Sequence, residues 1–205
     1  AKIEHEVTYP HIGMVVSGGH TSLYRVCSPS DIVQIGHTVD DAAGEAYDKV
    51  AKLLYLGYPG GVVIERISRG VDHNGIDFPR PLINDDTYDF SFSGLKTAVL
   101  NRVLREKIFE SMDLGFSGLP EKKRPLPGKE GMVSKIAAAF QAAVVDVLVA
   151  KAFKAVGDHG MKLLVVTGGV ASNGALREAL RKKAQETGIG LVIPDRKYCT
   201  DNAAM

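Results

Sequence analysis

The sequence predicts an α/β fold in which an antiparallel meander comes first and alternating helices and strands come last. Three observations support this prediction. Residues 11–37 hold three short apolar runs joined by tight links, long stretches with helical spacing follow, and two uninterrupted apolar runs lie near the end. Such an uninterrupted run is typical of a parallel strand buried on both faces. With 205 residues, 45% hydrophobic side chains and no internal repeat, we expect a single lobe spanning residues 1–205.

The meander is predicted over residues 12–37. Gly18 and Gly19 give its first link the backbone freedom of a tight turn. Short apolar runs bounded by such turn residues indicate strands that pair antiparallel. We expect these strands at 11–17, 22–27 and 32–37.

A helical insertion is predicted over about residues 41–112. It opens with a stretch rich in Ala, Leu, Lys and Glu, which indicates a helix over 42–56. Asp40 or Asp41 is the expected N-cap, and Gly57 is the expected stop. The rest of the insertion is predicted to be a short helix, a strand and a longer helix, at 62–69, 89–93 and 95–112.

Residues 113–132 hold four glycines and three prolines around a basic run, which is typical of a mobile loop. The α/β remainder is predicted over 133–205. Its elements are expected as helix, strand, helix and strand, at 133–156, 162–167, 174–187 and 190–194. This order matches a ribonuclease-H-like lobe, the unit that is joined in pairs in the actin-like ATPase (ASKHA) fold of actin and hexokinase.

Two glycine pairs end apolar runs at positions that face one cleft in such a fold. The pairs stand in VVSGGHTS (15–22) and VTGGVASN (166–173). A Cβ would keep backbone N–H groups away from phosphate oxygens, so glycine suits a phosphate-binding turn. Asn173 or Ser172 can cap the next helix, whose N-terminus favours an anion. A glycine pair can also merely form a turn, but two in the matching topology favour nucleotide binding.

Charged side chains suggest two further features. Asp41, Glu45 and Asp48 recur at helical spacing, so they form either an acidic wall for ribose or substrate N–H groups, or a solvated face neutralised by nearby lysines. Lys96 falls in a first helical turn, where the helix dipole disfavours a cation. An anion bound near Lys96, beside Ser91 and Ser93, would resolve that conflict; a lysine reaching solvent is the alternative.

Composition excludes little. The charge is balanced, with 25 Lys+Arg and 24 Asp+Glu, so no global basic field requires a nucleic-acid partner. The two cysteines, Cys27 and Cys199, are far apart, which favours a reducing compartment. The histidines form no HxxxH or HExxH pattern. We find no apolar run near the roughly 20 residues of a membrane span, so we expect a cytoplasmic protein with no membrane contact.

Six motifs in order resemble the tRNA threonylcarbamoyladenosine transferase family, TsaD, formerly labelled O-sialoglycoprotein endopeptidase or glycoprotease. The motifs are VVSGGHTSLYRV, VDDAAGEAYDKVAKLLYLGYPGG, FPRP, DFSFSGLKTAV, VTGGVASNGALR and CTDNAAM. They extend over the whole chain apart from 113–132, and SFSGLKTAV is similar to the bacterial or organellar branch. The resemblance implies transfer of a threonylcarbamoyl group from threonylcarbamoyl-adenylate to N6 of adenosine 37 in tRNAs that read ANN codons.

The resemblance also implies a site. By position in the motifs, the residues implied to bind the substrate or nucleotide are Val15, Val16, Ser17, Gly18, Gly19, Asp48, Gly61, Glu65 and Asn173. Glu65 stands where many family members carry aspartate. Asp201 matches a ligand of a divalent metal ion, iron or zinc, which would act as a Lewis acid; without the resemblance, Asp201 reads as an ordinary N-cap. The implied partners are tRNA, a TsaB-like paralogue and a TsaE-like ATPase.

This sequence departs from the family pattern in what it lacks. Two further metal ligands, in an HxxxH motif, and an N-terminal lobe are expected upstream of residue 1, and the C-terminal end is also absent. We therefore expect an incomplete metal site and little activity from this piece alone. Two alternatives are a metallopeptidase, disfavoured by the lack of a protease motif, and a non-catalytic scaffold paralogue, disfavoured by the intact site motifs. Basic residues of the predicted loop could contact tRNA phosphates, although a solvated loop explains them too: Lys122, Lys123, Arg124 and Lys129.

Overall fold

The computed structural model describes residues 7–110 and 124–199. Its centre is one five-stranded sheet with the strand order β3-β2-β1-β4-β5. The first three strands pair antiparallel, whereas β4 pairs parallel with both β1 and β5. The strands are β1 (His11–Val16), β2 (Thr21–Ser28), β3 (Asp31–His37), β4 (Leu163–Thr167) and β5 (Gly190–Val192). The predicted meander and the two later strands are thus confirmed.

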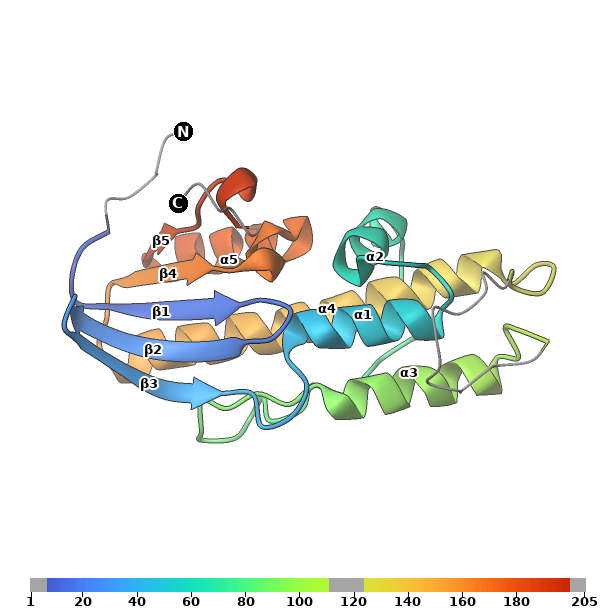
Figure 1. Cartoon of the computed structure of the whole chain (residues 1–205), viewed down its shortest axis with the longest axis horizontal. Coiled ribbons are helices and arrows are strands. Elements are labelled where there is room, and N and C mark those ends of the chain that lie inside the picture. The colour runs from blue at the N-terminus through green and yellow to red at the C-terminus, as the bar shows by residue number, and fades with distance from the viewer. Residues whose placement is uncertain (1–6, 111–123, 200–205) are drawn as a thin grey trace.

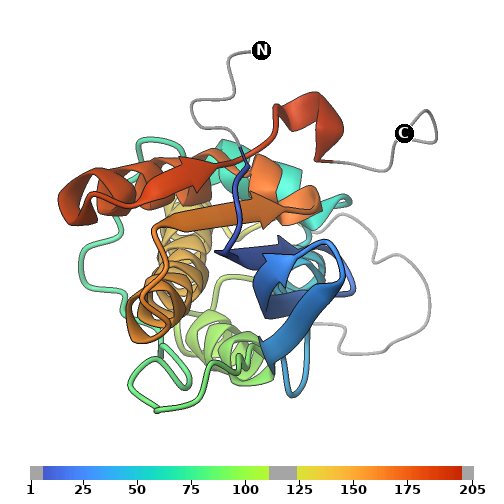
Figure 2. The ribbon, with the colours of Figure 1, turned by 90° about the vertical axis from the view of Figure 1, so that its left-hand side faces the viewer.

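Five α-helices accompany the sheet, with short 3-10 helices η1 (Gly169–Ser172) and η2 (Arg196–Tyr198) after β4 and β5. In Figure 1, α4 and α5 lie behind the sheet, while α1, α2 and α3 cluster beyond the end of β1. In Figure 2, which looks along the strands, α4 lies to one side of β1, β2 and β3. The helices are α1 (Ala43–Leu53), α2 (Gly60–Ser68), α3 (Ser93–Arg105), α4 (Glu130–Asp158) and α5 (Gly174–Thr187).

Helix α4 joins the two halves of the fold. One part of it packs on β1 and β4, and it also packs on α2, α3 and α5. Because other elements contact α4 from several sides, its side chains are apolar around most of its circumference, as expected of a core helix. By length and composition α4 could cross a membrane, contrary to the sequence expectation that no run is long enough, but 72% of its most apolar window is buried within the protein.

Several predicted boundaries were wrong for local reasons. The expected strand at 89–93 is only a single bridge between Thr38 and Phe90, because Ser93 already begins α3. Neither Asp40 nor Asp41 caps α1, whose N-cap is Ala42 without a side-chain bond. The predicted loop at 113–132 lies mostly outside the described residues, and its last three positions belong to α4.

Candidate functional site

The first glycine pair forms an open turn between β1 and β2. Ser17 closes the turn: its N–H donates to the carbonyl of His20 at 2.7 Å, and its hydroxyl accepts from the His20 N–H at 3.0 Å. Gly18 and Gly19 both lack a left-handed φ, and a Cβ on either would meet nothing within 4 Å. Because the fold itself leaves room for a side chain here, the open space beside these glycines is available to a ligand.

The second glycine pair is built differently. Gly168 has a φ of +102°, and a Cβ there would lie 2.3 Å from the carbonyl oxygen of Val16. Glycine is therefore required at this position by both backbone conformation and space. Gly169, by contrast, has no left-handed φ, and its nearest atom would be the Cys199 carbonyl oxygen at 3.8 Å. Only the first glycine of this pair is fixed by the fold.

Asn173 follows this loop and caps α5, as the sequence predicts. Its side-chain oxygen accepts from the N–H of Leu176 at 3.0 Å, and its amide nitrogen donates to Gln141 of α4 at 3.0 Å. Asn173 and Gln141 are both buried. Since both polar atoms of Asn173 bond inside the protein, this residue positions the loop and the start of α5.

The start of α1 brings the first loop close to the helices. The Gly44 N–H donates to the Ser17 carbonyl at 3.1 Å, and a Cβ on Gly44 would lie 2.6 Å from that oxygen. Gly44 is not among the predicted binding residues. Its signal was the Ala-Ala-Gly stretch of small residues at 42–44, which allows backbones to approach each other closely.

A cavity of about 240 Å³ lies between α1, α2 and the two glycine loops. Five of the nine predicted binding residues line it: Gly18, Asp48, Gly61, Glu65 and Asn173. The other four form β1 and its turn and are not among the lining residues: Val15, Val16, Ser17 and Gly19. The cavity also includes Gly169 of the second glycine pair, which the sequence predicts to face a phosphate. It adds residues that the sequence did not indicate as ligand contacts: Gly44, Tyr47, Pro59, Val62, Val170 and Ser172.

Two carboxylates define the polar side of this cavity. Asp48 accepts a 2.7 Å hydrogen bond from the N–H of Gly60, which starts α2. Glu65 accepts from the N–H of Gly174 at 3.1 Å, at the start of α5, and lies 3.6 Å from the guanidinium of Arg196. No Lys or Arg lines the described cavity. The site is therefore suited to hydroxyl and amino donors at the carboxylates, and to an anion only at backbone N–H groups.

Tyr47 forms an apolar wall of the same cavity. It follows Gly44 by one helical turn, and this spacing could have revealed it. Its side chain is buried edge-on against Phe140 at a ring-centroid distance of 5.2 Å. Burial, together with the nearby negative charge of Glu65, raises the pKa of Tyr47, so the phenol stays neutral at physiological pH.

The predicted acidic wall is not formed as a unit. Asp41 and Glu45 both pair with Lys49, at 2.6 Å and 2.9 Å, whereas only Asp48 lines the cavity. The hydrogen bond that the Lys49 ammonium donates to Asp41 raises the pKa of Lys49. The alternative reading, a face neutralised by neighbouring lysines, is thus correct for two of the three carboxylates.

The start of α3 already binds a carboxylate of the protein, that of Asp40. Asp40 accepts from the hydroxyls of Ser91 and Ser93 at 2.5 Å and 2.7 Å, and from the N–H of Phe92 at 2.8 Å. Burial alone would raise the pKa of Asp40, but these hydrogen bonds lower it below its ordinary value. A ligand anion predicted beside Lys96 is therefore unnecessary, because Asp40 occupies this helix end.

The predicted metal ligand, Asp201, lies outside the described residues, as does the rest of the motif after Cys199. Within residues 7–110 and 124–199, no three His, Cys, Asp or Glu side chains gather as a metal site would require. Cys199 itself is a buried free thiol whose sulfur accepts from Arg177 at 3.2 Å. The described residues thus do not provide a metal-binding set of their own.

Comparison with known proteins shows the family of this chain. A family model described as TsaD, tRNA N6-adenosine threonylcarbamoyltransferase, matches residues 1–205. A curated protein of that description from Geobacter sulfurreducens is 47% identical over 203 residues, which cover 99% of this chain and 54% of the relative. One from Thermosipho africanus is 45% identical over 204 residues, covering 97% and 56%. The chain spans about half the length of the curated relatives it matches.

Solved structures agree on the fold. Full-length HypF in a phosphate- and nucleotide-bound form matches with a TM-score of 0.65 at 13% identity, over 96% of this chain and 32% of HypF. An activator of 2-hydroxyisocaproyl-CoA dehydratase from Clostridium difficile with bound ADPNP matches with a TM-score of 0.50 at 15% identity, over 92% and 55%. These likenesses are consistent with the predicted actin-like ATPase fold.

Proposed function

The chain belongs to the TsaD family, tRNA N6-adenosine threonylcarbamoyltransferases, and on that basis we propose that it contributes the adenylate-binding part of such an enzyme. The proposed reaction transfers the threonylcarbamoyl group from threonylcarbamoyl-adenylate to N6 of adenosine 37 in tRNAs that read ANN codons. The N6 amine attacks the carbamoyl carbonyl carbon, and the bond to the phosphate oxygen breaks. AMP leaves with that electron pair, and N6 loses a proton.

The observation that carries this proposal is the cavity between the two glycine loops. Gly18 and Gly169 face it with no side chain, and neither is required to be glycine by the fold. Phosphate oxygens can therefore approach backbone N–H groups at both loops. Asp48 and Glu65 also line the cavity, and their carboxylates can accept hydrogen bonds from the ribose hydroxyls or the adenine amine of an adenylate.

The chemistry needs positioning more than an acid or base from this chain. An adenylate is already an activated acyl donor, so holding its carbonyl against the tRNA amine supplies much of the rate. We assign Asp48, Glu65 and the glycine loops to this role. A divalent metal, iron or zinc, would add Lewis-acid polarisation of the carbonyl, with Asp201 as one proposed ligand.

The proposed setting follows the family. We propose tRNA and threonylcarbamoyl-adenylate as substrates, a TsaB-like paralogue and a TsaE-like ATPase as protein partners, and the cytoplasm as the location. The match to transferase relatives supports tRNA in particular.

Gly61→Val tests the cavity. Gly61 is the second residue of α2 and lines the cavity, and a Cβ there meets nothing within 4 Å. We expect Gly61→Val to weaken binding of a stable threonylcarbamoyl-adenylate analogue by at least about tenfold, because the isopropyl group occupies ligand space while the fold tolerates it. Isothermal calorimetry on the intact protein measures this change.

Gly131→Val is the matched control. Gly131 is also the second residue of a helix, α4, and its Cβ likewise meets nothing within 4 Å, but it lies away from the cavity. This variant should bind the analogue as the parent does. Equal affinity of all three proteins would show that the adenylate binds elsewhere, and the adenylate assignment would then fail.

A further inference from the structure

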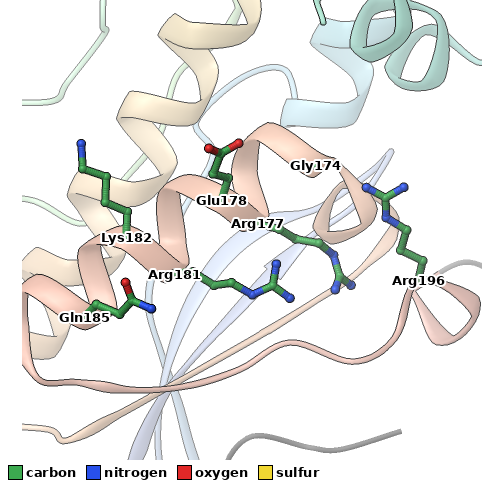
Figure 3. A pocket seen from close by; sticks show the side chains of 7 residues that line it. All are labelled: Gly174, Arg177, Glu178, Arg181, Lys182, Gln185 and Arg196. Carbon is green, nitrogen blue, oxygen red and sulfur yellow. The ribbon is translucent and has the colours of Figure 1, made fainter. Parts of the chain in front are cut away.

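A second, larger hollow of about 540 Å³ runs along the outer side of α5. It lies between that helix and the segment that follows β5 (Figure 3). Most of its lining side chains are basic: Gly174, Arg177, Glu178, Arg181, Lys182, Gln185 and Arg196. We call this hollow the α5 groove.

Arg177 is a buried lining residue of the α5 groove, and its hydrogen bonds hold the two sides of the groove together. Its Nε donates to the carbonyl of Ala171 at 2.7 Å, and its Nη2 donates to the Cys199 sulfur at 3.2 Å and to the carbonyl of Pro194. The side chain is only 7% exposed. Arg177 thus ties the segment after β5 to the start of α5, and that segment carries Arg196 to the groove.

The other basic groups face solvent. Arg181 follows Arg177 by four residues, so both project from the same side of α5, and Figure 3 shows their guanidinium groups together with that of Arg196. The one carboxylate of the lining, Glu178, points to the other side of the helix. Arg181 and Lys182 are exposed, and within the described chain neither forms an ion pair.

We propose that the α5 groove binds successive backbone phosphates of the tRNA substrate, an inference that rests on the proposed function. Guanidinium groups bind phosphate oxygens in bidentate geometry. Backbone phosphates of nucleic acids are the usual partners of exposed rows of Arg and Lys side chains. The helix from Arg177 to Gln185 rises by about 12 Å, at about 1.5 Å per residue. A row of that length allows the basic side chains along it to contact more than one backbone phosphate.

The location of the groove strengthens this assignment. Gly174 lines the groove, and its N–H donates to Glu65 of the cavity at 3.1 Å. Arg196 lies in the groove and also reaches Glu65, at 3.6 Å. The groove and the cavity therefore meet at the start of α5. A tRNA segment bound along α5 can therefore place one base at the start of α5, where the cavity begins.

The test is Arg181→Glu against Lys183→Glu in the intact protein. Lys183 sits on the same helix but does not line the groove, and it lies 3.9 Å from Glu186. Both substitutions change the net charge of the protein by the same amount. Any difference in tRNA affinity between the two variants therefore reflects the groove and not the overall electrostatic field of the protein. We expect Arg181→Glu to weaken tRNA binding at least tenfold at about 0.15 M salt, and to reduce the slope of log Kd against log salt by about 1 or 2.

Lys183→Glu should change tRNA affinity less than about threefold, and both variants should bind the adenylate analogue normally. Equal tRNA affinities for the two variants would overturn the groove proposal and leave the groove to another anionic partner, such as an acidic protein segment. So would a parent protein that binds the analogue but no tRNA. Failure of the proposed function would look different. In that case the unsubstituted protein would not bind the adenylate analogue in the calorimetry described for Gly61→Val.

Discussion

The two glycine pairs look alike in the sequence but serve different needs. In the second loop, Gly168 has a left-handed φ and the Val16 backbone lies where its Cβ would be, whereas Gly169 is unconstrained. In the first loop neither Gly18 nor Gly19 is constrained in this way. A glycine that the fold does not require, facing a cavity, is better evidence of a ligand than one that the fold requires. The comparison therefore separates structural from functional glycines within one motif type.

The largest expected effect is that of Gly168→Ala. A methyl group 2.3 Å from the Val16 carbonyl oxygen must displace β1 or the loop, and alanine is strained at a φ of +102°. We expect a loss of more than about 3 kcal/mol in the free energy of unfolding. Urea denaturation followed by circular dichroism measures it. Gly169→Ala is the control and should cost less than about 1 kcal/mol; similar losses for both variants would contradict the comparison.

A smaller effect is expected for Asn173→Ala, which removes the α5 cap and leaves Gln141 without its amide partner. Loss of such a cap costs about 0.5–2 kcal/mol, and an unpaired buried amide adds about 1–3 kcal/mol. We expect a total of about 2 kcal/mol in the free energy of unfolding. Asn173→Ser keeps a capping oxygen and should recover about 1 kcal/mol, as chemical denaturation would show. If serine recovered nothing, the cap would not be the stabilising element.

Much of the fold could be predicted from the sequence because periodicity reports burial directly. The apolar runs at 11–17 and 162–167 gave strands, and α5 begins and ends where its pattern and Asn173 place it. The pattern failed at 89–93, where polar and aromatic residues alternate as in a strand. There the chain makes a single bridge and then turns into α3, with Asp40 binding the turn.

The candidate site was predicted only in part, because sequence does not show which polar groups are already paired. Asp41 and Glu45 share the helical spacing of Asp48, yet Lys49 binds both of them. Asn173 resembles a ligand contact, but both its polar atoms bond within the protein. The α5 groove was missed because it needs Arg196 from the segment after β5, and only the folded chain brings that segment beside α5.

The smallest expected effect on stability, and the sharpest test of the first loop, is Gly18→Ala. Its Cβ meets nothing within 4 Å, so the free energy of unfolding should change by less than about 0.5 kcal/mol. Gly18 nevertheless lines the cavity, and a methyl group there would separate the loop N–H groups from a phosphate. We expect about tenfold weaker binding of the adenylate analogue by calorimetry at unchanged stability. Unchanged affinity would mean that the loop N–H groups beside Gly18 do not bind the phosphate, and the ligand role of the first loop would be contradicted.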